Sequence, residues 1–252
     1  MKGKPKYNLG NRVTFKLEEK EYRGNIYIID PYGTWDDPND VSYDIMVNNW
    51  GPKKEECLFK HINENLIINY MKIFFDTEFT GLHKNTTLIS IGLVTEDDRS
   101  FYAEFIDYDL SQCNDWIKEN VIDNLLLNDY ETFEKRIING DTYVRGTKET
   151  IVEELKEWLS VYDNIELVSD CCHYDMMLFV DLFGNAFDLP KNINPVCHDI
   201  NQDIANRYDL SETWAFNKSR EEILEENGIN IEGNKHNAFY DAKVIKEIYN
   251  IL

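Results

Sequence analysis

Apolar and polar residues alternate through much of the first 70 positions of the chain. Between residues 12 and 17 every second side chain is apolar, as in a strand with one buried face. Similar short runs occur at 25–30, 42–47 and 56–60, and the segments between them are rich in Pro, Gly, Asn and Asp, which favour turns. The pattern predicts a small all-β domain, a barrel, over residues 1–70.

Aromatic residues in this first part have two interpretations. They could stack on nucleic-acid bases, or they could pack in the core and turns of the barrel. Packing is the favoured interpretation, because large aromatic side chains are commonly used to fill a small core. The residues concerned are Phe15, Tyr27, Trp35, Tyr43 and Trp50.

Longer apolar runs begin at residue 71. The segments 72–79, 87–96 and 100–108 each have the composition of a strand, and the polar sequence EDDR lies between the last two. Three strands in succession predict a meander. A further run, IELVS at 165–169, predicts a buried fourth strand.

A helical spacing of apolar residues appears between and after these strands. We expect one helix at 116–127 and another from Thr147, where apolar residues recur along one face. A third is expected at about 175–183, closed by Gly184, because Gly readily adopts the left-handed conformation that ends a helix.

The last predicted helix, from Asn237, carries a carboxylate on its apolar face. Asp241 shares that stripe with Ala238, Ala242 and Ile245. Burying an unpaired carboxylate is costly, so the pattern indicates that Asp241 has a specific partner in the fold.

Composition indicates a folded protein without a membrane segment. Of the 252 residues, 42% are hydrophobic and 13% aromatic, which is too many for a disordered chain. The apolar runs are far shorter than the roughly 20 residues of a membrane helix. The start, MKGKPKYNLGNR, lacks the apolar run of a secretory signal, and five cysteines without a C-x-x-C motif indicate reduced thiols. We therefore expect a cytoplasmic location.

The negative charge is concentrated in the second part of the chain. The net charge is −21, with 10 Lys and Arg against 11 Asp and Glu in residues 1–70 and 16 against 36 in residues 71–252. Such a surface excludes broad, nonspecific binding of duplex nucleic acid. It remains compatible with a metal-dependent nuclease, because cations held by carboxylates can meet the phosphate at the reaction centre.

Four carboxylates and a histidine form the candidate chemistry. Asp76 and Glu78 stand two apart near the end of a predicted strand and so project to one face, and Asp175, His236 and Asp241 follow in that order. D-x-E alone is a weak signal. Carboxylates brought together repel one another, so a cation is the simplest way to hold them.

The donor types indicate which cation and which reaction. Oxygen ligands favour Mg²⁺ or Mn²⁺, and two such ions roughly 4 Å apart can stabilise the attacking and leaving oxygens of phosphodiester hydrolysis. A base must also take a proton near neutral pH, and histidine suits that task. His236 is the candidate for it, on a mobile loop before the last helix.

The segments FFDTEFTGL, CCHYD and HNAFYDA resemble, in order, the three motifs of the DEDDh 3′–5′ exonucleases, the superfamily of proofreading exonuclease domains, RNase T and oligoribonuclease. The resemblance covers about residues 71–252. It implies that Asp76, Glu78, Asp175 and Asp241 are metal ligands and that His236 is the catalytic histidine. The tyrosine-using sister group would require Tyr at position 237, where this chain has Asn.

Three further segments, HYDMMLFVDLFG, PVCHDI and DWIKENV, look most like the bacterial and phage 3′–5′ exoribonuclease-like branch. This implies an α/β fold with an RNase H-like mixed sheet flanked by helices, two divalent ions, and release of nucleoside 5′-monophosphates. The second motif departs from the usual H-N-x-x-F-D, because Asp170 and Cys171 occupy its first two places. Asp170 and Asp181 are therefore alternatives to Asp175. The first 70 residues weakly resemble SH3-like or KOW-like barrels.

Residues after the first motif hold the terminal nucleotide in such enzymes. The resemblance thus implies Thr80, Gly81 and Leu82 as substrate-binding residues, with main-chain contacts near Thr77, and Tyr174 as a surface for a base or sugar. The alternative is structural: Thr80 and Gly81 shape a turn, and Tyr174 belongs to the core.

We expect a 3′–5′ exoribonuclease acting on short or single-stranded 3′ ends, with a small β-barrel that helps to choose a nucleic-acid substrate or a protein partner. One alternative is the same chemistry on DNA. The other is a non-catalytic adaptor that binds a protein through the barrel, which the complete carboxylate and histidine set disfavours.

Overall fold

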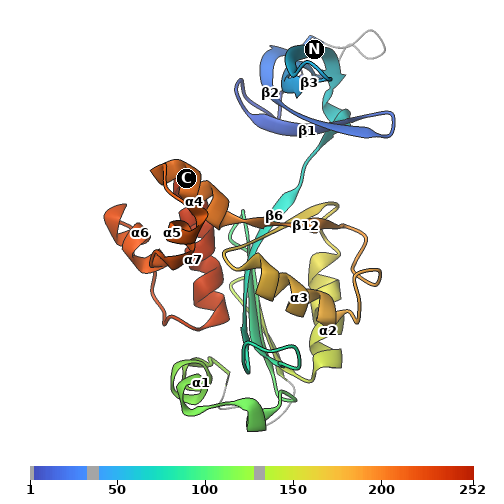
Figure 1. Ribbon diagram of the computed structural model, residues 1–252. Helices are drawn as coiled ribbons and strands as arrows, with labels where there is room; N and C mark the ends of the chain where they lie inside the picture. Colours follow the sequence, from blue (N-terminus) through green and yellow to red (C-terminus); the bar gives the residue numbers. More distant parts are fainter. Residues whose placement is uncertain (1–2, 33–39, 128–133) are drawn as a thin grey trace. The chain divides into compact units, whose positions relative to one another are not determined.

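Two separate sheets form in this computed structural model, which describes residues 3–32, 40–127 and 134–252 (Figure 1). They belong to two units, Met1–Tyr70 and Met71–Leu252. None of the described helices is both long and apolar enough to cross a membrane.

The first unit is an antiparallel five-stranded sheet with strand order β4-β3-β2-β1-β5. Alternation on β1 places Val13 and Phe15 in its core, as the sequence pattern predicts. Phe15 and Tyr43 are fully buried, whereas Tyr27 is exposed; Trp35 lies outside the described residues. The strands are β1 (Arg12–Leu17), β2 (Lys20–Asp30), β3 (Ser42–Trp50), β4 (Glu55–Asn63) and β5 (Ile67–Ile68).

The second unit contains a mixed seven-stranded sheet of order β12-β11-β6-β7-β8-β10-β9. The predicted meander is its antiparallel β6–β7–β8 part, and β11 runs parallel to both β6 and β12. This confirms the predicted α/β class. The strands are β6 (Met71–Phe79), β7 (Leu88–Thr95), β8 (Ser100–Phe105), β9 (Glu134–Ile138), β10 (Asp141–Gly146), β11 (Ile165–Ser169) and β12 (Ile193–Asp199).

Helices cover both faces of this sheet (Figure 1). Successive residues of β6 show the two layers, since Ile73 and Phe75 pack in the core with α2 and α3, whereas Phe74 packs in the core with α4 to α7. The helices are α1 (Asp115–Asn120), α2 (Lys148–Leu159), α3 (Cys172–Leu182), α4 (Ile200–Tyr208), α5 (Glu212–Asn217), α6 (Arg220–Glu226) and α7 (Ala238–Ile251).

One glycine permits the close packing of α7 on the sheet. A Cβ atom at Gly92 of β7 would lie 2.2 Å from the carbonyl oxygen of Ala238, in the first turn of α7. Any larger residue would push the start of α7 away from the strand, so Gly92 sets the distance between this helix and the sheet.

The helix predicted at 116–127 is wrong in length. α1 ends at Asn120, and a short 3₁₀ turn, Ile122–Asn124 (η3), follows it. Two asparagine side chains compete for helix carbonyls here: Asn120 Nδ2 donates to Trp116 O at 2.8 Å and Asn124 Nδ2 donates to Asn120 O at 2.5 Å. Such local bonds weaken a helix and favour its termination.

Candidate active site

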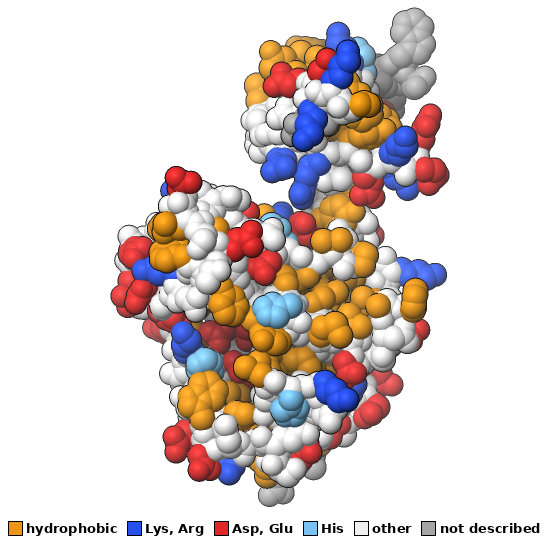
Figure 2. Space-filling view, in the orientation of Figure 1, with side chains coloured by type: hydrophobic (Ala, Val, Ile, Leu, Met, Phe, Trp, Pro, Cys, Tyr) orange, Lys and Arg blue, Asp and Glu red, His pale blue; other side chains and the backbone are white. Residues whose placement is uncertain are grey.

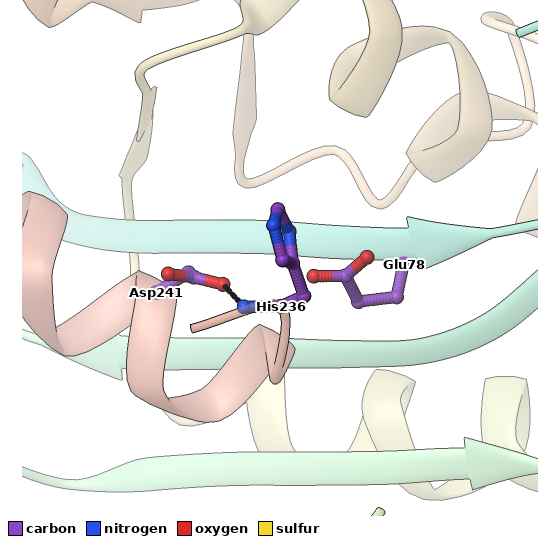
Figure 3. A group of neighbouring side chains, drawn as sticks. All are labelled: Glu78, His236 and Asp241. Carbon is purple, nitrogen blue, oxygen red and sulfur yellow. Dashed lines mark hydrogen bonds between the residues drawn. The ribbon is translucent and has the colours of Figure 1, made fainter. Parts of the chain in front are cut away.

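The first two carboxylates come from the end of β6. Glu78 lies with His236 and Asp241, and one potential ligand atom from each of the three falls within 4.8 Å of the others (Figure 3). Asp76 forms a second such group with Asp170 and Asp175. The fold therefore brings together all five residues that the sequence singled out, from β6, α3 and the start of α7.

Asp241 is placed by the way in which α7 begins. Asn237 caps this helix, with its side-chain oxygen accepting from the backbone N–H groups of Phe239 at 3.1 Å and Tyr240 at 3.2 Å. One turn later, Asp241 Oδ2 accepts from the backbone N–H of His236 at 2.8 Å (Figure 3). That bond ties the helix carboxylate to the residue that precedes the helix cap.

Asp175 is almost completely buried in the first turn of α3, with 2% of its surface exposed. Its Oδ1 accepts from the Thr77 backbone N–H at 3.2 Å and from the Thr77 hydroxyl at 2.6 Å. Its Oδ2 accepts from the Ser169 hydroxyl at 2.5 Å. Thr77 thus uses both its backbone and its side chain to fix this carboxylate.

The two alternatives to Asp175 lie in different surroundings. Asp170 is near Asp76 but forms an ion pair with Arg220, whose Nε donates at 2.9 Å. Asp181 is mostly exposed and pairs with Lys148 at 2.7 Å. Asp170 therefore shares the site with Asp175, whereas Asp181 is engaged by α2.

The pKa values of the four carboxylates are all raised. Burial, followed by the negative charges of the neighbouring acidic residues, raises the pKa of Asp76 and Glu78 well above the usual range. Burial is also the largest cause of the raised pKa of Asp175, to about 7, and of Asp241, to about 8. Such a cluster is unfavourable when fully ionised.

An unsatisfied oxygen lies within this cluster. Asp76 Oδ2 is buried and has no hydrogen-bond partner among the described residues. A buried polar atom of this kind needs a partner, and clustered carboxylate oxygens are the ligands that hard divalent cations prefer. The donor set therefore fits Mg²⁺ or Mn²⁺, with Asp76, Glu78, Asp175 and Asp241 available to hold the ions.

His236 lies outside the helix, before the cap residue. Its backbone is left-handed, with φ at +63°, and its ring packs edge to face on Trp116 with centroids 4.9 Å apart. Burial, and then the positive charge of Lys235, lower the pKa of the imidazole. The ring is therefore kept neutral at a lower pH than a free histidine.

A cavity of about 440 Å³ gives access to these groups, and Figure 2 shows it as a hollow with an acidic floor. The segment 216–221, which includes Lys218 and Arg220, also lines this cavity. No sequence pattern indicated this segment, because nothing in the spacing of residues on α5 and α6 links them to β6.

A second cavity, of about 450 Å³, shares Phe79 and Tyr174 with the first. Gly81 and Leu82 line it, and Leu82 is 73% exposed. Thr80 is instead buried, and its hydroxyl bonds to Gln112 at 2.5 Å.

Comparison with known proteins gives a family and a fold. Residues 71–252 match the model of a family described as the 3'-5' exoribonuclease Rv2179c-like domain. Two curated relatives, 3'-5' exoribonuclease Rv2179c and 3'-5' exoribonuclease MT2234.1, come from two strains of Mycobacterium tuberculosis, H37Rv and CDC 1551. Each is 28% identical to this chain over 134 residues, which cover 52% of this chain and 73% of the relative.

A solved structure with the same fold is the nuclease domain of 3'hExo, a DEDDh family member, bound to rAMP. It superimposes with a TM-score of 0.51 at 16% identity, covering 71% of this chain and 89% of that one. The likeness confirms the predicted RNase H-like arrangement of strands and helices. The match to the family model begins at residue 71, after the β-sheet unit at the start of the chain.

Proposed function

The chain belongs to the family of 3'-5' exoribonuclease Rv2179c-like domains through residues 71–252, and from this premise we propose how it acts. The enzyme removes nucleoside 5′-monophosphates from the 3′ end of short or single-stranded RNA in the cytoplasm, with two divalent ions, Mg²⁺ or Mn²⁺. The observation that carries the proposal is the grouping of Asp76, Glu78, Asp175 and Asp241 at one site, in which a buried oxygen of Asp76 has no hydrogen-bond partner among the described residues.

The carboxylates have one shared task, to bind the cations in a fixed arrangement. These residues would hold the ions, and the chemistry supplied there would be a lowered pKa of a water molecule and neutralisation of charge on the departing 3′ oxygen. Thr77 and Ser169 orient Asp175 through three hydrogen bonds, and the His236 backbone orients Asp241. These bonds limit the rotation of each carboxylate before any ion binds.

His236 takes the proton of the attacking water. Its lowered pKa keeps the imidazole neutral, and so able to accept a proton, near neutral pH. Its position beside Glu78 and Asp241 places the imidazole next to the carboxylates and outside the helix that carries Asp241.

The second cavity is suited to the terminal nucleotide. Leu82 and Tyr174 offer exposed apolar surface there, beside the backbone of Gly81. Thr77 and Thr80 contribute by holding Asp175 and the turn after β6, respectively. The negative charge of this unit disfavours long duplexes, because their phosphates would be repelled.

For residues 1–70 we propose an accessory binding role, as an SH3-like unit that contacts longer substrates or a protein partner. A half-exposed Trp50 lies against Tyr22 and Phe59, with ring centroids 5.2 and 5.1 Å away. Such an aromatic edge offers a surface for bases or for apolar side chains.

Labelled oligomers test the catalytic part of the proposal. RNA and DNA labelled at the 5′ or the 3′ end would be incubated with Mn²⁺, Mg²⁺ or EDTA, with Asp241→Asn as the control protein. We expect a ladder of shortened 5′-labelled RNA, labelled mononucleotide from 3′-labelled RNA, and no product in EDTA. Internal fragments, or cleavage that survives EDTA, would contradict the proposal, and faster cleavage of DNA would reverse the substrate preference.

A further inference from the structure

Three contacts connect the loop around His236 to the segment Asp115–Asn124, which comprises α1 and η3 and is called here the α1–η3 segment. The Trp116 ring packs edge to face on the His236 ring at 4.9 Å. Asn124 contacts both neighbours of His236: its side-chain Nδ2 donates to Lys235 O at 3.3 Å, and its carbonyl oxygen accepts from Asn237 Nδ2 at 2.8 Å. The histidine is thus held at its ring and on both sides of its backbone.

The backbone of this loop requires such support. His236 is a non-glycine residue at φ +63°, a left-handed conformation that costs free energy relative to the usual backbone regions. Gly233, three residues earlier, has φ +145°. Without outside contacts, a segment of this kind would adopt many conformations, and the imidazole would leave the carboxylates for much of the time.

Two other contacts of the loop do not hold the imidazole ring. The His236 backbone N–H donates to Asp241 Oδ2 at 2.8 Å, which fixes the backbone but not the side-chain rotamer. Lys235 forms an ion pair with Glu221 at 3.3 Å, but the lysine side chain is 54% exposed. Exposed ion pairs contribute little because water screens them. The α1–η3 segment therefore supplies the ring contact of His236 and, together with the Asp241 bond, supports the backbone of the loop.

Asn124 and Trp116 are themselves held in place. Asn124 Nδ2 also donates to Asn120 O, and Asn120 Nδ2 donates to Trp116 O, so the two residues belong to one chain of hydrogen bonds. Ile117, between them, is buried beside Ile89 and Val121. This fixes the segment to the core of the catalytic unit and makes it a rigid support for the loop.

We propose that Trp116 and Asn124 are positioning residues that hold the His236 imidazole at the carboxylate cluster. The inference rests on the proposed function, in which His236 takes the proton of the water. A catalytic group must be held within a fraction of an ångström of its productive position, so loss of the support lowers turnover without removing any group that touches the substrate.

The test is a double-mutant cycle. Trp116→Ala and Asn124→Ala are made in the wild type and in His236→Ala, with Leu126→Ala as the matched control, because Leu126 is a similarly exposed apolar residue of the same region, at 54% against 52% for Trp116. We measure kcat and KM on a short RNA, and Mn²⁺ affinity by calorimetry. Trp116→Ala should lower kcat about 10-fold with KM and Mn²⁺ affinity unchanged, and should change kcat by less than about 2-fold in the His236→Ala background.

Each other result has a defined meaning. An equal fall in kcat in the wild-type and His236→Ala backgrounds would overturn the inference. A rise in KM with constant kcat, or a loss of Mn²⁺ affinity, would overturn it as well. Trp116→Phe keeps an aromatic ring against His236 and should restore most of kcat; failure to do so counts against it. If Trp116→Ala does not fold, Asn124→Ala decides by the same criteria, since it removes only a small side chain. Wild-type turnover in His236→Ala itself would instead defeat the proposed function.

Discussion

Asp175 accepts two hydrogen bonds from Thr77, one from the backbone N–H at 3.2 Å and one from the hydroxyl at 2.6 Å, although the two residues are 98 positions apart. Thr77 lies between Asp76 and Glu78 on β6. The strand that supplies the first two carboxylates therefore also orients the third, so the geometry of the site depends on how α3 and β6 pack.

Asp76→Asn and Asp241→Asn should each abolish hydrolysis and leave the protein folded. Without metal, either variant should be as stable as the wild type or slightly more stable, because one charge is removed from a repelling cluster. Cleavage of labelled RNA and thermal unfolding in EDTA measure both effects, with the exposed Asp181→Asn as control. Near wild-type cleavage by either variant at saturating Mn²⁺ would make the site assignment wrong.

A direct comparison of Asp175→Asn with Asp170→Asn should show which acidic residue of the second motif is required for activity. Asp175 is fixed by three hydrogen bonds, whereas one oxygen of Asp170 is engaged by Arg220. We expect Asp175→Asn to be inactive, and Asp170→Asn to keep turnover within about 10-fold of the wild type, as for a residue next to the reacting groups. An inactive Asp170→Asn beside an active Asp175→Asn would exchange their roles.

The sequence predicted the parts of the fold that have strong periodicity. The β6–β7–β8 meander has long apolar runs, and α2 and α7 have clear apolar faces, so these elements were identified. The edge strand β9 was missed, since most of its residues are exposed and no apolar alternation marks it. The helix at 116–127 was overextended, because side-chain bonds from Asn120 and Asn124 are not visible in an apolar pattern.

The candidate site was predictable only through motifs. Asp76, Glu78, Asp175, His236 and Asp241 were found because their order resembles a known family, and the structure places them together. Arg220 had no such signal, because it reaches the site through tertiary packing of a helix that has no fixed spacing from the motifs. Trp116 lies in the DWIKENV segment, but nothing in that segment indicated a contact with His236.

The stability of the metal-free protein should fall as pH rises. The folded-state pKa is about 7 for Asp175 and about 8 for Asp241, above the value of about 4 in an unfolded chain. The folded state therefore binds these protons more tightly, so their contribution to stability is complete below pH ~4 and is lost as pH rises to about 8. Urea unfolding in EDTA at several pH values measures this change in the free energy of unfolding, with Asp241→Asn for comparison. The free energy should decline less with pH in the variant. An identical pH dependence in both proteins would contradict the raised pKa of Asp241.

Binding of Mn²⁺ should show the opposite dependence on pH. The ion must displace the protons held by the carboxylates of raised pKa, Asp175 and Asp241. Its affinity should therefore increase as pH rises towards about 8. Calorimetry in buffers of different ionisation enthalpy should reveal protons released on binding. An affinity that is constant between pH 6 and pH 8 would show that these groups are already ionised without metal.

A fragment of residues 71–252 should fold and cleave short RNA, because all five proposed site residues and both of their cavities lie within that unit. Loss of residues 1–70 should instead weaken binding of longer or structured substrates, or of a protein partner. Activity on oligomers of increasing length, compared with the full chain, measures this. An insoluble or inactive fragment would mean that the two units depend on each other for folding.

His236→Ala should separate the general base from the metal ligands. His236 lies before the cap of α7 and contacts Asp241 through its backbone N–H, a bond that alanine can also make. Turnover should therefore fall on the order of 10²- to 10⁴-fold, as for loss of a general base, while Mn²⁺ and RNA affinities change little.

At saturating Mn²⁺ the acidic limb of the wild-type pH profile should follow one group titrating below 6.5, since burial lowers the pKa of His236 from that value. A base works only when neutral, so activity should decline as pH falls through this pKa, and the limb should flatten in the variant. If His236→Ala loses Mn²⁺ binding in calorimetry while Asp241→Asn keeps it, the histidine is a ligand and this mechanism fails.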